Sequence, residues 1–126
     1  MAKQILVIDE NSSDARITQL ALQRHYPDRA IHLAASLPDG LARLAAEDGA
    51  GIDRVVVSSR MGGSNTSAFV AMLTRLYPEV AVFVVTGQRT PWEQTAFRTA
   101  GARAVIEKCF DFDDYISVLS PLAEPL

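Results

Sequence analysis

Five short apolar runs, separated by longer amphipathic stretches, are the feature that most restricts the fold of this chain. Residues 5–8, 55–57 and 80–85 are unbroken runs rich in β-branched side chains. Runs of this kind are typical of strands that are covered on both faces, as in a parallel sheet. Residues 30–34 alternate as an edge strand does, and the short run 104–106 fits the opposite edge. The pattern predicts a sheet with buried central strands.

A helical pattern follows each run. The first spans about residues 13–26, with Ile17, Leu20 and Ala21 on its inward face and Pro27 at its end. The expected inward stripes of the other helices are Leu37, Leu41 and Leu44; Phe69, Met72, Leu73 and Leu76; Ala96, Phe97 and Ala100; and Phe112, Tyr115, Ile116 and Leu119. The start signals are Ser36 with Asp39, Ser64 with Asn65, and Thr90 with Pro91 and Glu93; the stop signals are Gly49 and Gly51, Pro78, and Gly101.

Strands and helices therefore alternate as (βα)₅. Right-handed crossovers turn this alternation into a twisted parallel sheet with helices on both faces. A closed barrel needs more units, so we expect an open, doubly wound α/β sheet with strand order 2-1-3-4-5. A chain of 126 residues forms one domain. We place the domain at residues 1–120 and assign residues 121–126, which contain two prolines, to a C-terminal tail or the start of a linker.

The composition argues against several classes of function. The net charge is −3, and no stretch has the clustered basic residues of a nucleic-acid-binding domain. The N-terminal apolar run is too short for a signal peptide or a membrane span. Cys109 is the single cysteine, so the chain has no intrachain disulfide and no cysteine metal cluster. We therefore expect a cytoplasmic protein that binds neither nucleic acid through this domain nor membranes.

The residues that follow the predicted strands form a candidate site. In open parallel sheets, ligands bind outside the carboxyl ends of the strands. Asp9 and Glu10 follow the first strand, Ser58 ends the third, Thr86 ends the fourth and Lys108 follows the fifth. Adjacent carboxylates resist ionising together unless a cation is near. Mg²⁺ and the Lys108 ammonium are the two candidates for that cation.

Four segments carry a resemblance to a known family: ILVIDEN, DRVVVSSRMGG, VFVVTG and GARAVIEKCFD. In their order, spacing and position at strand ends, they resemble the receiver domain of bacterial two-component response regulators. The resemblance covers nearly the whole chain. It implies a flavodoxin-like, CheY-like fold and a role in two-component or phosphorelay signal transduction.

The resemblance also implies roles for the residues at the strand ends. In the family, the acidic pair after strand 1 holds Mg²⁺, which matches Asp9 and Glu10. A further metal ligand there is a backbone carbonyl, which matches that of Arg60. The family's hydroxyl residue that responds to the phosphoryl group matches Thr86, and the lysine that pairs with the phosphorylated aspartate matches Lys108.

The sequence departs from the family at several of its positions. Ser58 stands where the family has the aspartate that accepts the phosphoryl group, and Val105 stands at the aromatic switch position. Lys108 is followed by Cys109 where the family has proline, often with a cis bond, so we expect a trans bond here. Residues 61–63 end in two glycines where proline is usual, and we expect this loop to be more mobile.

Loss of the aspartate changes the expected chemistry. A serine hydroxyl is a poor nucleophile until a base takes its proton, and neither His25 nor His32 is placed to serve Ser58. We therefore expect no phosphorylation in the usual way, no catalytic residue and no enzymatic activity. With one carboxylate fewer, Mg²⁺ should bind weakly, and no cofactor is required. Arg60 or Lys108 would then fill the charge gap beside the acidic pair.

The resulting prediction is an atypical receiver, or pseudo-receiver, that acts through protein–protein interaction. The resemblance implies a histidine kinase, an output domain or a regulator as partner, bound by the face of helix 4, strand 5 and helix 5. Trp92 lies near this face and is expected to be a partly buried anchor, and a homodimer is a further option.

One alternative is a conventional phosphorelay receiver with a displaced acceptor, although Asp53 begins strand 3 at the wrong end of the sheet. Another is a flavodoxin-like module for a nucleotide or flavin, although the loop after strand 1 is acidic and lacks a glycine-rich phosphate cradle.

Overall fold

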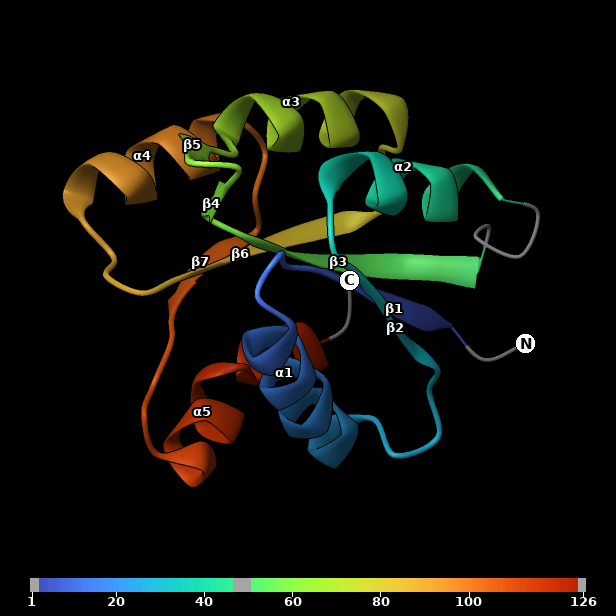
Figure 1. The fold of residues 1–126 in the computed structure, drawn as a ribbon, viewed down its shortest axis with the longest axis vertical. Coiled ribbons are helices and arrows are strands. Elements are labelled where there is room, and N and C mark those ends of the chain that lie inside the picture. Colours follow the sequence, from blue (N-terminus) through green and yellow to red (C-terminus); the bar gives the residue numbers. More distant parts are fainter. Residues whose placement is uncertain (1–2, 47–50, 125–126) are drawn as a thin grey trace.

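A five-stranded parallel sheet forms the centre of the protein (Figure 1). The structure is a computed structural model that describes residues 3–46 and 51–124. The strands of the sheet are β1 (Gln4–Ile8), β2 (Ile31–Ala34), β3 (Ile52–Ser58), β6 (Ala81–Thr86) and β7 (Ala104–Glu107). Their order is β2-β1-β3-β6-β7, and all neighbours run parallel. This confirms the open, doubly wound sheet and the strand order predicted from the sequence. The fourth and fifth predicted strands correspond to β6 and β7.

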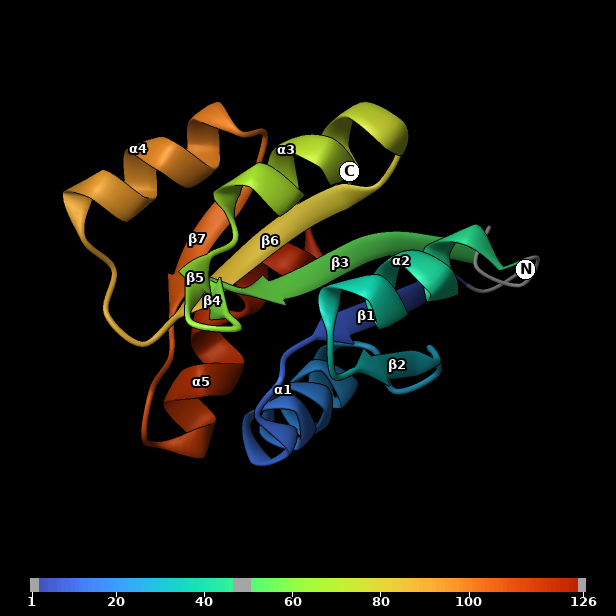
Figure 2. The ribbon, with the colours of Figure 1, turned by 45° about the horizontal axis from the view of Figure 1, so that its top comes forward.

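Helices cover both faces of the sheet, as Figures 1 and 2 show. One face carries α1 (Ser12–His25) and α5 (Phe112–Val118). The opposite face carries α2 (Leu37–Ala45), α3 (Ser67–Leu76) and α4 (Pro91–Thr99). Among the described residues, no helix has both the length and the apolar character needed to cross a membrane.

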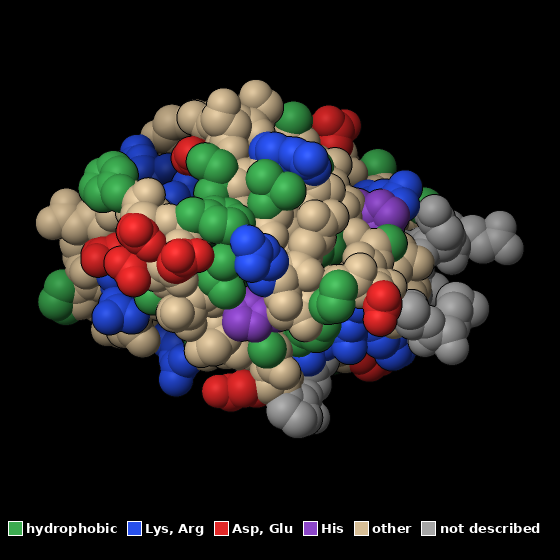
Figure 3. Space-filling model, turned by 90° about the horizontal axis from the view of Figure 1, so that it is seen from below, with side chains coloured by type: hydrophobic (Ala, Val, Ile, Leu, Met, Phe, Trp, Pro, Cys, Tyr) green, Lys and Arg blue, Asp and Glu red, His purple; other side chains and the backbone are tan. Residues whose placement is uncertain are grey.

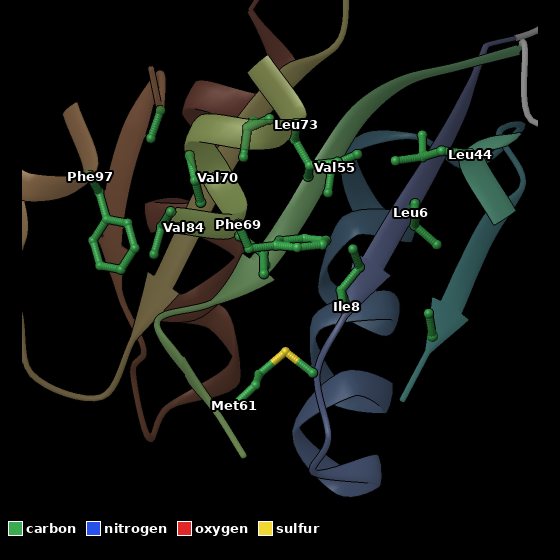
Figure 4. Close-up of a cluster of buried hydrophobic side chains, with 14 of the residues drawn as sticks. Leu6, Ile8, Leu44, Val55, Met61, Phe69, Val70, Leu73, Val84 and Phe97 are labelled. Carbon is green, nitrogen blue, oxygen red and sulfur yellow. The ribbon is translucent and has the colours of Figure 1, made fainter. Parts of the chain in front are cut away.

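Two apolar cores, one on each face of the sheet, hold these layers together. Successive side chains of a strand point to opposite faces, so Ile5 and Val7 pack against α1 and α5 while Leu6 and Ile8 pack on the other side. Figure 4 shows the second core, into which α4 inserts Phe97. Phe97 is fully buried, and burial of such a side chain contributes roughly 1.5–3 kcal/mol.

The inward face of α1 differs from the prediction. Its buried residues are Ala15, Thr18, Ala21 and Leu22. Ile17 and Leu20, expected to be buried, are 44% and 38% exposed. Thr18 points inward because its hydroxyl and that of Tyr115 on α5 are hydrogen-bonded at 2.7 Å, a polar contact that apolar periodicity cannot reveal. Hydrophobic side chains consequently gather on the face that α1 and α5 present to solvent (Figure 3).

The segment before α3 also differs from the prediction. Ser64 and Asn65 were expected to cap the helix, but they form β5 (Ser64–Asn65), which pairs with β4 (Arg60–Met61) in an antiparallel hairpin. The turn consists of Gly62 and Gly63, whose φ angles of 61° and 76° suit a two-residue hairpin turn. The helix starts after this hairpin and ends at Leu76, which is 59% exposed and not part of the core.

The start signals of α2 and α4 are confirmed. The Ser36 hydroxyl accepts a hydrogen bond from the backbone N–H of Asp39 at 3.1 Å, and Thr90 and Glu93 form a complete capping box. Gly101 stops α4 with a φ of +109°, a conformation that suits glycine. Gly49, the first predicted stop signal of α2, lies outside the described residues.

The chain after α5 returns to the sheet. Residues Ser120–Ala123 form a short 3-10 helix, and Leu122 is fully buried. Arg54, itself buried in β3, donates from Nε to the Leu122 carbonyl at 2.7 Å and from Nη2 to the Glu124 carbonyl at 2.9 Å. Part of the segment that the sequence assigns to a tail is therefore held against the opposite end of the sheet from the candidate site.

Candidate functional site

The predicted site residues lie along one edge of the sheet, at the carboxyl ends of its strands. Asp9 directly follows β1, Ser58 ends β3, Thr86 ends β6 and Lys108 directly follows β7. Parallel pairing continues past the strands, because the backbone N–H of Lys108 donates to the Thr86 carbonyl at 2.8 Å. The sheet thus brings a carboxylate, two hydroxyls and an ammonium group to one edge, and we refer to this group of strand-end residues as the crevice.

Lys108 supplies the cation of this crevice. Its Nζ lies 3.4 Å from Asp9 Oδ2 and 2.9 Å from Asp14 Oδ2. The Asp9 carboxylate is buried and also accepts a hydrogen bond from the backbone N–H of Asn11 at 3.0 Å. Sequence reasoning proposed the contact with Asp9 but missed Asp14, whose place in the first turn of α1 was the available signal. The geometry makes Lys108 the internal counter-ion of two carboxylates.

Glu10 contacts the β4–β5 hairpin. Its carboxylate accepts hydrogen bonds from the backbone N–H of Gly62 at 3.1 and 3.2 Å. Arg60, the other expected partner of the acidic pair, donates from its guanidinium to the Gly63 carbonyl at 2.8 Å. Of the two residues expected to fill the charge gap, Lys108 lies beside Asp9, whereas the side chains of Arg60 and Glu10 hold the β4–β5 hairpin.

The side chain of Ser58 makes a short-range hydrogen bond. Its hydroxyl donates to the Arg60 carbonyl at 3.2 Å, and its own carbonyl accepts from the Thr66 hydroxyl at 2.7 Å. The two histidines lie elsewhere: His25 bonds the Ile116 carbonyl at 2.7 Å, and His32 bonds the Gln4 side chain at 2.6 Å. No imidazole is thus placed to activate the Ser58 hydroxyl.

Thr86 takes part in a hydrogen-bond network that the sequence did not predict. Its buried hydroxyl accepts from the Ser59 hydroxyl at 3.1 Å. It lies 3.1 and 3.2 Å from the two carboxylate oxygens of Glu93, in the first turn of α4. Sequence reasoning identified Glu93 only as part of a helix start signal, since a local motif does not show which strand end faces that turn.

The residues expected to bind Mg²⁺ do not fit that ion in this arrangement. Mg²⁺ demands near-octahedral oxygen geometry. Asp9 faces Lys108, Glu10 faces the hairpin, and the Arg60 carbonyl accepts from Ser58. Within residues 3–46 and 51–124, no group of three or more histidine, cysteine, aspartate or glutamate side chains is placed to hold a metal ion.

The surface formed by α4, β7 and α5 contains a groove of about 420 Å³. Its lining residues include Arg89, Gln94, Arg98, Val105 and Val118. Val105 is buried in β7, and its carbonyl accepts from the Arg89 guanidinium at 3.2 Å. Trp92, expected to be partly buried, is 63% exposed, because it lies in the first turn of α4 and projects into solvent.

The loop after β7 has the expected backbone. The described residues contain no cis peptide bond, so the Lys108–Cys109 bond is trans, as predicted. Cys109 is half-buried in this loop. On the adjoining face of the sheet, burial raises the pKa of Tyr115 to about 12. The hydrogen bond with Thr18 opposes that shift, and the Tyr115 hydroxyl remains protonated at neutral pH.

Solved structures with the same fold include several response regulators. A CheY-like receiver domain protein from Methanospirillum hungatei JF-1 is 20% identical with a TM-score of 0.79, covering 98% of this chain and 94% of that chain. The receiver domain of a DNA-binding response regulator from Colwellia psychrerythraea 34H is 19% identical with a TM-score of 0.80, covering 98% and 99%. A Burkholderia pseudomallei response regulator, solved with a phosphorylated aspartic acid and a calcium ion, is 23% identical with a TM-score of 0.76, covering 96% and 68%. The TM-scores show that these proteins share the fold of this chain.

The family of the chain is identified from its sequence. A comparison with curated proteins gives no match. The family model described as the response regulator receiver domain matches residues 5–120, which include every strand-end residue of the crevice. The chain therefore belongs to the response regulator receiver domain family.

Proposed function

We propose that this receiver domain acts by protein–protein interaction and is not phosphorylated on an aspartate. The observation that carries the proposal is the residue at the end of β3. It is Ser58, and its hydroxyl donates to the Arg60 carbonyl. A hydroxyl needs a base before it can attack a phosphoryl donor, and both histidines bond other groups. In this proposal the domain is a pseudo-receiver with no enzymatic activity.

Internal neutralisation of the crevice supports the same proposal. Lys108 faces two carboxylates, which occupy the ammonium group that would otherwise pair with a phosphorylated acceptor. Mg²⁺ binding should be weak because the cation would compete with Lys108 for Asp9. The domain then requires no cofactor.

The proposed partner surface is the face of α4, β7 and α5. Trp92 is exposed in the first turn of α4, and the groove beside β7 is flanked by Arg89 and Arg98. Gln94 also lines the groove. An exposed aromatic side chain and two cations suit a protein partner such as a histidine kinase, an output domain or a second copy of the chain.

The alternative of a conventional receiver with a displaced acceptor has less support. Asp53, the nearest acidic residue along β3, lies at the amino end of the strand. Its carboxylate is 2.6 Å from Arg54 Nη1 and 3.3 Å from Arg29 Nη1. A flavin or nucleotide in the crevice is disfavoured as well, because Asp9, Glu10 and Asp14 would repel phosphate.

The test is to add beryllofluoride with Mg²⁺ and record amide NMR spectra of the wild type and of Ser58→Asp. We expect no shift changes at the crevice in the wild type and partial shifts in β3, β6 and β7 in the variant. Ser64→Asp, in the exposed turn region nearby, controls for the added charge. Beryllofluoride-dependent shifts in the wild type, or phosphorylation by acetyl phosphate detected by mass spectrometry, would contradict the proposal.

A further inference from the structure

The Thr86–Glu93 contact joins the crevice to the first turn of α4. Thr86 ends β6, and residues 87–90 carry the chain outward to α4 (Figure 2). Glu93 reaches back across this loop, so its carboxylate lies beside both the Thr86 hydroxyl and the backbone N–H of Thr90, the latter at 3.4 Å. One carboxylate thereby binds the strand end and the helix start together.

The direction of the hydrogen bonds follows from the available protons. The Ser59 hydroxyl donates to the Thr86 oxygen, which leaves the single Thr86 proton for an acceptor. The carboxylate of Glu93 accepts at 3.1 Å, whereas the competing carbonyl of Gln88 lies at 3.3 Å. A hydrogen bond to an ionised acceptor is roughly twice as strong as one between neutral groups. The buried Thr86 hydroxyl is therefore committed to Glu93.

A second contact restrains the same loop from the other side. The backbone N–H of Arg89 donates to the Glu107 carboxylate on β7 at 2.8 Å, and the Arg89 guanidinium donates to the Val105 carbonyl. Glu107 and Val105 fix the middle of the loop to β7, but neither reaches the helix. Attachment of the first turn of α4 to the end of β6 thus falls to Glu93.

We propose that Glu93 is an internal latch: its carboxylate holds the Thr86 hydroxyl and keeps the first turn of α4 docked on the crevice without a phosphoryl group. The consequence is a fixed position for the start of α4, including the exposed Trp92, and hence for one end of the proposed partner face. The regulatory meaning of the latch rests on the proposed function, because in a domain that is not phosphorylated no phosphoryl group competes with Glu93 for the Thr86 hydroxyl. The contact itself can be tested separately.

The decisive variant is Thr86→Val, which removes the hydroxyl while preserving the size of the side chain. It leaves the capping box of Thr90 and Glu93 intact, so it separates the latch from ordinary helix capping. Amide hydrogen exchange of residues 93–99 is the readout. Loss of a hydrogen bond to a charged group should accelerate exchange there by roughly tenfold to a hundredfold, while the amides of β1 should keep their rates.

A double-mutant cycle identifies the partner. In a Glu93→Gln background the charge is already gone, so Thr86→Val should have a clearly smaller effect on α4 than in the wild type. The matched control is Thr66→Val, since Thr66 is also a buried threonine beside a helix start and its hydroxyl donates to the Ser58 carbonyl. That variant should alter exchange near α3 and leave α4 unchanged.

Unchanged α4 exchange in Thr86→Val, or equal effects of Thr86→Val in the two backgrounds, would overturn the latch. The beryllofluoride experiment judges the proposed function independently. A wild-type response to beryllofluoride together with faster α4 exchange in Thr86→Val would refute the proposed function and support the contact. Absence of both effects would support the proposed function and refute the latch.

Discussion

Replacement of Lys108 by methionine should show how much the ion pairs of Lys108 with Asp9 and Asp14 contribute to the free energy of unfolding. The variant preserves the apolar stem of the side chain and removes the ammonium group from Asp9 and Asp14. Removing one partner of a fully buried ion pair costs about 3–5 kcal/mol. Here the side chains of Lys108 and Asp14 are 24% and 41% exposed, so solvent screening reduces the effect. We expect a loss of about 1–2 kcal/mol in the free energy of unfolding.

Mg²⁺ should restore much of that stability, because the carboxylates lose their internal cation and become available to metal. For a dissociation constant of about 1 mM, a concentration of about 10 mM stabilises the folded state by RT ln(1 + [L]/Kd), or about 1.4 kcal/mol. The measurement is urea unfolding of wild type and Lys108→Met, each with Mg²⁺ and with EDTA. The wild type should gain much less from the metal.

Lys3, the other lysine of the chain, is exposed and provides the control Lys3→Met, which should match the wild type in both buffers. The reasoning would be refuted if the wild type and Lys108→Met gained equal stability from Mg²⁺. It would also be refuted if Lys108→Met were as stable as Lys3→Met in EDTA.

Three further predictions follow from the packing and titration of other residues. Gly101→Ala should lower the free energy of unfolding by about 1–3 kcal/mol in thermal or urea unfolding, because a side chain is strained at φ +109° and its Cβ would lie 2.8 Å from the Thr74 side chain. Arg54→Met should lower the free energy of unfolding by about 1.5–3 kcal/mol, because the Leu122 carbonyl loses a charged donor. The segment around Leu122 should also become more sensitive to limited proteolysis, and unchanged cleavage would contradict this role of Arg54. Burial raises the pKa of Tyr115 from 10.0 to about 12, so folding favours the neutral phenol. The neutral phenol therefore contributes roughly 2–3 kcal/mol to the free energy of unfolding below pH 10, and this contribution is lost as the pH rises through 12. Urea unfolding of Tyr115→Phe between pH 9 and 12 should lack this component of the alkaline destabilisation.

The strands and the strand-end residues could be predicted because they depend on patterns that the sequence contains. Unbroken apolar runs fixed the central strands, and the chirality of crossovers limited their order. Once the order was known, Asp9 and Lys108 had to lie at the same edge of the sheet. The inward face of α1 could not be predicted in this way, because its buried position at Thr18 is stabilised by a partner, Tyr115, almost a hundred residues away.

The contacts within the crevice depend on side-chain geometry that no spacing rule contains. Asp14 lies in the first turn of α1, beyond the acidic pair, and only the direction of the Lys108 side chain shows that it shares the cation. The β4–β5 hairpin changes the role of Glu10, because the backbone N–H of Gly62 in the hairpin turn donates a hydrogen bond to the Glu10 carboxylate. The motif thus identifies which groups approach the crevice but not which of them pair.

These pairings explain why an aspartate placed at position 58 is expected to give only part of a conventional receiver's response. A carboxylate at position 58 would require Lys108 to leave Asp9 and Asp14, and a phosphoryl mimic would require Thr86 to leave Glu93. Each existing contact is charge-assisted and partly buried, so each displacement costs free energy that the new contact must exceed. The proposed pseudo-receiver would therefore be held in one state by the whole set of contacts around the crevice, and the serine at the end of β3 would be only one member of that set.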